Sequence, residues 1–219
     1  MKLVTFGCSL TYGTGLSDCW IPTEGSLGSS GEYPSKLAWP NKLRHLLNIE
    51  ILKNLSRGGS SNKEIAYNIQ QELIEGRIKQ DDIVIVLWSH LDRHCIITKK
   101  QSSSNETIQT LGTWMPDIKD DQQARMSKVF FRHLHNDHDM MYETALRQDY
   151  IYHKLKQLNV KQFHISTHLP YKQFEWLDVP FLNINFHQIR NKHPLALDES
   201  HPGEQAHNEF AESIYKEIQ

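Results

Sequence analysis

An uninterrupted apolar run, Ile83–Trp88 (IVIVLW), constrains the fold of this chain more than any other segment. Strands that are apolar at every position are typical of parallel sheets whose two faces are both covered by helices. Shorter hydrophobic segments recur along the chain and are predicted to be further strands, at residues 2–6, 49–55, 161–167 and 181–184. Because helical patterns separate most of these strands, the sequence predicts βαβ units. The expected fold is a three-layer α/β/α sandwich around a mostly parallel, flavodoxin-like sheet.

Local signals place the helices between these strands. Pro40 marks the first turn of one helix, and the capping box Ser61-Asn-Lys-Glu64 begins the next. Residues 122–158 follow a helical pattern that breaks near Asn136, and the last helix is predicted over residues 202–218. There is no internal repeat and no linker composition, so we expect one domain spanning the whole chain.

Two polar stretches are predicted to be irregular. Residues 13–36 are rich in Gly and Ser, and residues 98–122 lack both a helical and a strand period. Long loops in compact domains are often lids or binding loops, so the first stretch is a candidate for substrate contact.

Composition excludes several classes of protein. The 219 residues include 24 Lys and Arg against 26 Asp and Glu, a balance that argues against a broad nucleic-acid-binding surface. No apolar run approaches the roughly 18–20 residues of a membrane-spanning helix, and the run before Gly7 is too short for a secretory signal. The three cysteines lack CxxC spacing, which argues against a disulfide framework or a zinc site. We therefore expect a reduced, cytoplasmic protein without membrane insertion, nucleic-acid partner or cofactor.

The segments that follow the strands are the candidate site, because open parallel sheets bind ligands beyond the carboxyl ends of their strands. GCSLT follows the first strand, RGGSSN the second and SHLDR the apolar run, while DESHPG precedes the last helix. Together these segments bring a serine, a glycine-rich turn, and an Asp–His pair to one edge of the sheet.

These are the residue types that acyl transfer requires. A serine hydroxyl, here that of Ser9, needs a histidine to remove its proton, and His201 is the candidate base. That histidine needs a carboxylate to orient it, a role that Asp198 can fill. The oxyanion of the tetrahedral intermediate needs N–H donors, which the amides of Ser9 and Gly59 could supply.

The motifs resemble those of the SGNH hydrolases, also called the GDSL esterases. FGCSLTYG is similar to the first block, which places Ser9 at the nucleophile, and NLSRGGSSN to the second, which places Gly59 in the oxyanion hole. DESHP is similar to the last block, with Asp198 as the triad acid and His201 as the base. The resemblance covers residues 3–215. It implies a metal-independent serine esterase that forms an acyl-enzyme and acts on a small-molecule or carbohydrate ester, often an O-acetyl group.

Two positions depart from the family pattern. Cys8 occupies the place of the aspartate that usually precedes the nucleophile; that aspartate is not the triad acid. The third block usually supplies an Asn whose side chain donates to the oxyanion, but the strand here ends in LWSHLDR. His90 is the candidate for the missing donor, and loss of such a donor typically costs about 10²–10³ in rate. Arg93 and Asn62 are candidate substrate-binding residues.

Other interpretations remain open at this point. Ser9 could be a turn serine, Gly58-Gly59 a tight turn, and the Asp198 segment a helix cap. An acyltransferase would use the same triad, and the missing donor would also fit an impaired binding module on the same scaffold. A metal-dependent hydrolase is less favoured, although the chain has 13 histidines. His133 and His135 are two residues apart and point to different faces of a helix, so no metal site is predicted. The oligomeric state is open.

Overall fold

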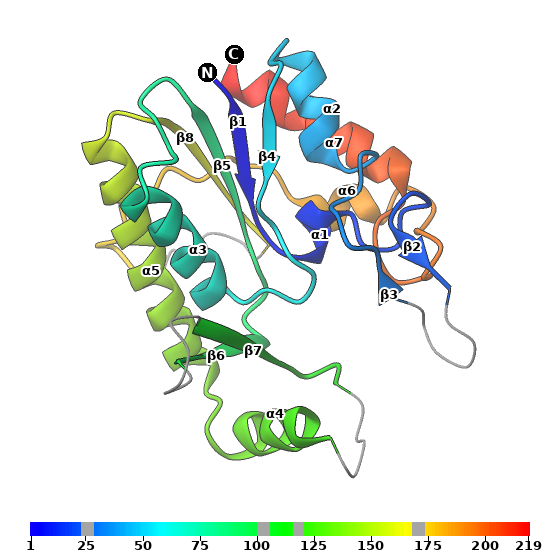
Figure 1. Cartoon of the computed structure of the whole chain (residues 1–219), viewed down its shortest axis with the longest axis vertical. Helices are drawn as coiled ribbons and strands as arrows, with labels where there is room; N and C mark the ends of the chain where they lie inside the picture. Colours follow the sequence, from blue (N-terminus) through cyan, green and yellow to red (C-terminus); the bar gives the residue numbers. More distant parts are fainter. Residues whose placement is uncertain (23–28, 100–105, 116–120, 168–173) are drawn as a thin grey trace.

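The computed structural model describes residues 1–22, 29–99, 106–115, 121–167 and 174–219 (Figure 1). Its centre is a four-stranded, entirely parallel sheet in the order β4-β1-β5-β8. The strands are β1 (Leu3–Phe6), β4 (Leu52–Asn54), β5 (Ile83–Trp88) and β8 (Lys161–Ser166). Of the strands in this sheet, β4 lies on one side of β1, and β5 and then β8 lie on the other side. This is the flavodoxin-like order, and the predicted fold class is confirmed.

Helices cover both faces of the sheet because alternate residues of the buried strand β5 point to opposite sides. Ile85 and Leu87 belong to the cluster that contains the helices α2 (Trp39–Leu46), α6 (Phe186–Arg190) and α7 (Glu204–Ile218). Val84 and Val86 belong to the cluster that contains the helices α3 (Asn62–Ile74) and α5 (Asp137–Gln157). Figure 1 shows the resulting three layers.

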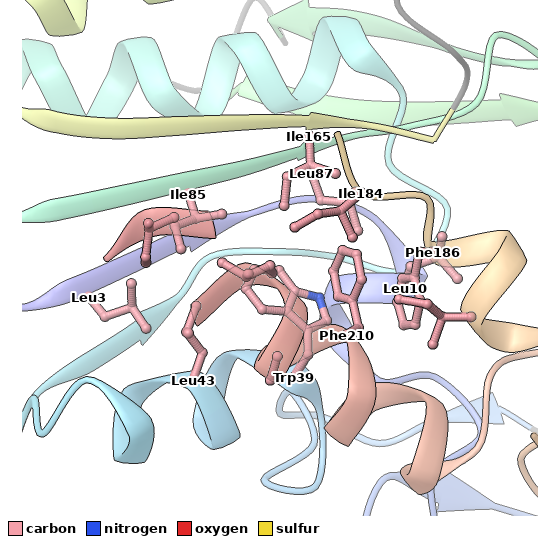
Figure 2. Close-up of a cluster of buried hydrophobic side chains, with 14 of the residues drawn as sticks. Leu3, Leu10, Trp39, Leu43, Ile85, Leu87, Ile165, Ile184, Phe186 and Phe210 are labelled. Carbon is pink, nitrogen blue, oxygen red and sulfur yellow. The ribbon is translucent and has the colours of Figure 1, made fainter. Parts of the chain in front are cut away.

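Aromatic rings occupy the hydrophobic core on the side of the sheet that α2 and α7 cover (Figure 2). The ring of Phe210 stacks on Phe186 with centroids 4.1 Å apart, and Trp39 meets the Phe210 ring edge-on at 5.6 Å. Leu10, the second residue of the single turn α1 (Ser9–Tyr12), is buried in the same cluster. Burying a side chain of this size contributes about 1.5–3 kcal/mol, so the turn that begins with Ser9 is anchored in the core.

The helix boundaries largely follow the predicted signals. Ser61 caps α3 by accepting a hydrogen bond from the backbone N–H of Glu64 (3.3 Å). The Glu64 carboxylate, however, bonds to Arg57 instead of completing the capping box. The predicted helical stretch is indeed two helices, α4 (Gln122–His133) and α5, and the Asn136 side chain caps the second.

Two predictions from the sequence are wrong. The stretch 98–122 is not irregular throughout: β6 (Arg93–Lys99) and β7 (Glu106–Gly112) form an antiparallel hairpin. Figure 1 shows this hairpin and α4 beyond the carboxyl end of the central sheet. The expected strand 181–184 is reduced to a single bridge, between Phe181 and His164 of β8.

The predicted loop 13–36 is irregular where the structure describes it, except for a short antiparallel pair. This pair joins β2 (Trp20–Ile21) to β3 (Ser29–Ser30). Among the residues that the structure describes, no helix combines the length and the apolar character needed to cross a membrane.

Candidate active site

A cavity of about 960 Å³ lies where the segments after the strands meet. Ser9 from the end of β1, Gly59 from the segment after β4 and His90 from the segment after β5 all line it. Asp198 and His201, from the loop before α7, line the same cavity. The structure thus brings six of the seven candidate residues, Arg93 among them, around a single space; the exception is Asn62.

Ser9 begins α1 directly after the first strand, and it is 4% exposed. The backbone carbonyl of Cys8 accepts hydrogen bonds from the amides of Thr11 and Tyr12, both at 2.9 Å, and so closes the turn. A Cβ atom at Gly7 would overlap the Thr11 side chain, so this turn requires glycine there. Within the described part of the chain, the Oγ of Ser9 has no hydrogen-bond partner, so it forms no hydrogen bond with His201.

Asp198 and His201 form a tight pair. The Nδ1 of His201 lies 2.5 Å from Oδ2 of Asp198, and the other carboxylate oxygen accepts the backbone N–H groups of Ser200 (3.1 Å) and His201 (3.0 Å). Partial burial opposes ionisation of Asp198, but the hydrogen bonds from His201 and Ser200 outweigh it and hold the pKa of this carboxyl well below its ordinary value. An ionised Asp198 retains the proton on Nδ1, which leaves Nε2 as the basic nitrogen of the ring.

Two residues that the sequence analysis did not single out hold this loop in place. Gly15 has a φ of +85°, accepts a hydrogen bond from the Leu197 amide (2.9 Å), and approaches Asp198 so closely that a Cβ would lie 2.6 Å from its Cγ. Arg190 donates from Nη2 to the backbone carbonyl of Ser200 (2.7 Å). Gly15, in the stretch TYGTGL, is a residue type that often marks a special backbone conformation, whereas no sequence pattern indicates the role of Arg190.

Gly59 adopts a left-handed backbone conformation (φ +78°) next to Trp114 and Thr110. The turn that contains it is held by Arg57, whose Nε donates to the buried carboxylate of Glu64 (2.6 Å) and whose Nη2 donates to Thr110 Oγ1 (2.9 Å). The hydrogen bond with Glu64 raises the pKa of Arg57 further above its ordinary value.

Asn62 and His90 both lie near the end of β5, but only His90 lines the cavity. Asn62 is buried and does not line the cavity; its side chain accepts from the Ser89 amide (2.6 Å) and donates to the Ser89 carbonyl (3.0 Å). This residue therefore secures the strand end. His90 does line the cavity, with its ring centroid 4.9 Å from that of His187. Its role as an oxyanion donor stays a prediction.

Arg93, at the start of β6, packs its guanidinium over the ring of Trp114 at 4.9 Å from the centroid. Its Nε and Nη1 atoms are buried and have no hydrogen-bond partner among the residues that the structure describes. Arg93 is thus a cation on the cavity wall without a carboxylate partner of its own.

Three histidines outside the pair are buried or packed against aromatic rings. His94 stacks on Phe130 with centroids 4.3 Å apart, and burial lowers its pKa to about 4. His164 and His207 are fully buried, and burial lowers the pKa of each to about 3. In the described ranges, no group of three or more His, Cys, Asp or Glu residues is arranged to hold a metal ion.

Comparisons with known proteins agree with this architecture. No protein-family model matches the sequence, and no curated protein sequence is similar to it. Among solved structures, the chain is similar to TesA, with a TM-score of 0.57 at 10% identity over 100% of this chain and 98% of TesA. A lipolytic protein of the G-D-S-L family from Desulfitobacterium hafniense gives a TM-score of 0.54 at 11% identity over 100% of this chain and 99% of that protein.

The esterase EstA from Pseudoalteromonas, solved as inhibited by monoethylphosphonate, gives a TM-score of 0.55 at 10% identity over 99% of this chain and 96% of EstA. The chain therefore has the fold of the GDSL, or SGNH, esterases, and the resemblance stated from the motifs is confirmed at the level of the fold.

Proposed function

We propose that this chain is a serine esterase of the SGNH type that hydrolyses a small acyl ester, with Ser9 as nucleophile, His201 as base and Asp198 as the residue that orients the base. The observation that carries the proposal is the shared cavity: Ser9, the Asp198–His201 pair and Gly59 line one space at the carboxyl edge of the sheet. The fold shared with solved esterases supports the same reaction class.

In the proposed reaction, Nε2 of His201 takes the hydroxyl proton of Ser9 while Oγ attacks the ester carbonyl. The amides of Ser9 and Gly59 donate to the oxyanion of the tetrahedral intermediate. The intermediate collapses when the C–O bond to the alcohol breaks and His201 returns its proton to the leaving oxygen. Water, activated by His201, then hydrolyses the acyl-enzyme and releases the acid.

The proposal requires a hydrogen bond between Ser9 and His201 in the substrate complex that the free protein does not show. Catalytic hydrogen bonds are often long in free enzymes and shorten when substrate binds, so the unpartnered Ser9 hydroxyl is compatible with the reaction. The His201 side chain is 24% exposed and lines the cavity, so a substrate in the cavity can contact it.

Hydrolysis of 4-nitrophenyl acetate by the wild type and by Ser9→Ala tests the proposal. We expect wild-type turnover and a loss of about 10³-fold or more in kcat for Ser9→Ala, because the nucleophile is removed. Ser60→Ala is the matched control: its hydroxyl is also buried without a partner among the described residues, but it does not line the cavity. Equal activity in Ser9→Ala and wild type would contradict the mechanism.

A further inference from the structure

We propose that the natural ester carries an anionic group, a carboxylate or comparable oxyanion, in its alcohol part, and that Arg93 binds this group. The inference rests on the proposed function because it names the substrate class of the same cavity. It starts from the charges on the cavity wall, which include three arginines, Arg57, Arg93 and Arg190, against two carboxylates, Asp92 and Asp198.

Most of these charges already have partners. Asp198 is paired with His201, and Arg57 is paired with the buried carboxylate of Glu64, so neither leaves an uncompensated charge on the wall. Asp92 is exposed and accepts a hydrogen bond from a threonine hydroxyl. Of the charged groups on this wall, Arg93 and Arg190 are the two cations that form no ion pair with any described residue.

Arg93 is the better placed of the two to bind an anion. Its Nε and Nη1 are buried without hydrogen-bond partners in the described chain, which is costly, so a small shift of the guanidinium toward an anion in the cavity would gain hydrogen bonds that the free protein lacks. A guanidinium fork matches the two oxygens of a carboxylate or phosphate. Packing on Trp114 restricts the plane of that fork, so the side chain loses little freedom when an anion binds. Arg190 has a second duty, because it donates to the Ser200 carbonyl next to His201.

The position of Arg93 assigns the anion to the alcohol part. An acetyl-sized acyl group fills only a small portion of a cavity of about 960 Å³, so the walls farther from Ser9 surround the alcohol. Trp114, on which Arg93 packs, borders Gly59, with its Cζ2 3.4 Å from the place of a Cβ on that glycine. The Trp114 ring therefore separates Arg93 from Gly59 of the proposed oxyanion hole. We infer that a charged group on the alcohol can extend from the oxyanion hole to Arg93.

Three aryl acetates with one common ring test the inference: methyl 4-acetoxybenzoate, 4-acetoxybenzoate and 4-acetoxyphenyl phosphate. For each ester we measure kcat/KM relative to its rate with hydroxide, which corrects for the leaving group. We expect wild type to prefer at least one anionic ester by about tenfold to hundredfold, the size of a charge-assisted hydrogen bond. Comparing the two anionic esters shows whether the site prefers a carboxylate or a phosphate.

Arg93→Gln should lower kcat/KM for the preferred anionic ester by about tenfold to hundredfold more than for the neutral ester, which removes the preference, and Arg93→Lys should restore part of it. Arg125→Gln is the matched control, since it removes the same charge from an exposed position on α4 outside the cavity. An equal preference in Arg93→Gln and wild type would overturn the inference.

A second measurement covers the case in which Arg93→Gln does not fold. On the wild type, the phenol released from the preferred anionic ester should inhibit hydrolysis of the neutral ester at least about tenfold more tightly than methyl 4-hydroxybenzoate, because only the first carries the anion that Arg93 binds. Equal inhibition by the two phenols would refute the role of a cation. If the wild type hydrolyses the neutral ester and shows no preference for the anionic esters, this inference alone is overturned. If it hydrolyses none of the three esters, the proposed function is overturned as well.

Discussion

Replacing Asn62 by Ala should destabilise the protein substantially. The side chain of Asn62 holds the Ser89 amide at 2.6 Å and the Ser89 carbonyl at 3.0 Å, and it is 4% exposed. The substitution leaves two buried backbone groups without partners, at about 1–3 kcal/mol each. We therefore expect the free energy of unfolding to fall by about 3 kcal/mol. For a chain of this size that corresponds to a decrease in the melting temperature of roughly 6–12 °C.

Urea unfolding followed by circular dichroism measures this change, and Asn68→Ala is the matched control. Asn68 lies in the same helix, α3, and is only partly buried, so its replacement should change stability by less than about 0.5 kcal/mol. If Asn62→Ala were as stable as Asn68→Ala but had a raised KM, Asn62 would be the substrate contact that the sequence suggested. The structural role assigned to it would then be wrong.

Three further predictions follow from the same geometry. Gly15→Ala should lower kcat by about 10²-fold because its Cβ would displace Asp198. Gly76→Ala is the control and should keep full activity in the same assay, because Gly76 also has a positive φ but a Cβ there would have only a lysine amine within 4 Å. Asp198→Asn should lower kcat by roughly 10³–10⁴-fold with little change in KM, and an unchanged kcat would exclude it as the triad acid. Burial lowers the pKa of His164 and His207 to about 3, so the unfolded chain, whose histidines titrate near about 6.5, binds more protons between these values. Burial of these two rings therefore lowers the stability of the fold least when the pH is above about 6.5, where the histidines are neutral in both states, and the free energy of unfolding decreases as the pH falls below that value. Urea unfolding should therefore show a loss of about 2 kcal/mol per histidine from about pH 7 to about pH 5, and a flat profile would contradict their burial as neutral rings.

Sequence signals predicted the central sheet and the main candidate residues because both depend on local patterns. The apolar run Ile83–Trp88 required cover on both faces, and the structure supplies it. Asp198 and His201 are three residues apart, so one tight turn brings them together, and Ser9 follows its strand directly. Each of these features needs only a few neighbouring residues to form.

Features that depend on distant partners could not be predicted in the same way. The β6–β7 hairpin has few apolar residues; β6 contacts α3, β7 contacts α4, and Cys95 and Leu111 of the hairpin are buried. Asn62 could be read as a substrate ligand because nothing local indicates its bonds with Ser89, 27 residues away. The stacking of Arg93 on Trp114 likewise joins two segments that the sequence does not connect.

The most direct test of the proposed mechanism is covalent labelling with a fluorophosphonate, followed by mass mapping of the modified peptide. We predict a single adduct on the hydroxyl of Ser9, absent in Ser9→Ala and formed much more slowly in His201→Gln, because the base activates the nucleophile. Ser60→Ala should label like the wild type. A protein that remains unlabelled, or that carries the adduct on a residue other than Ser9, would contradict the assignment of Ser9 as the nucleophile.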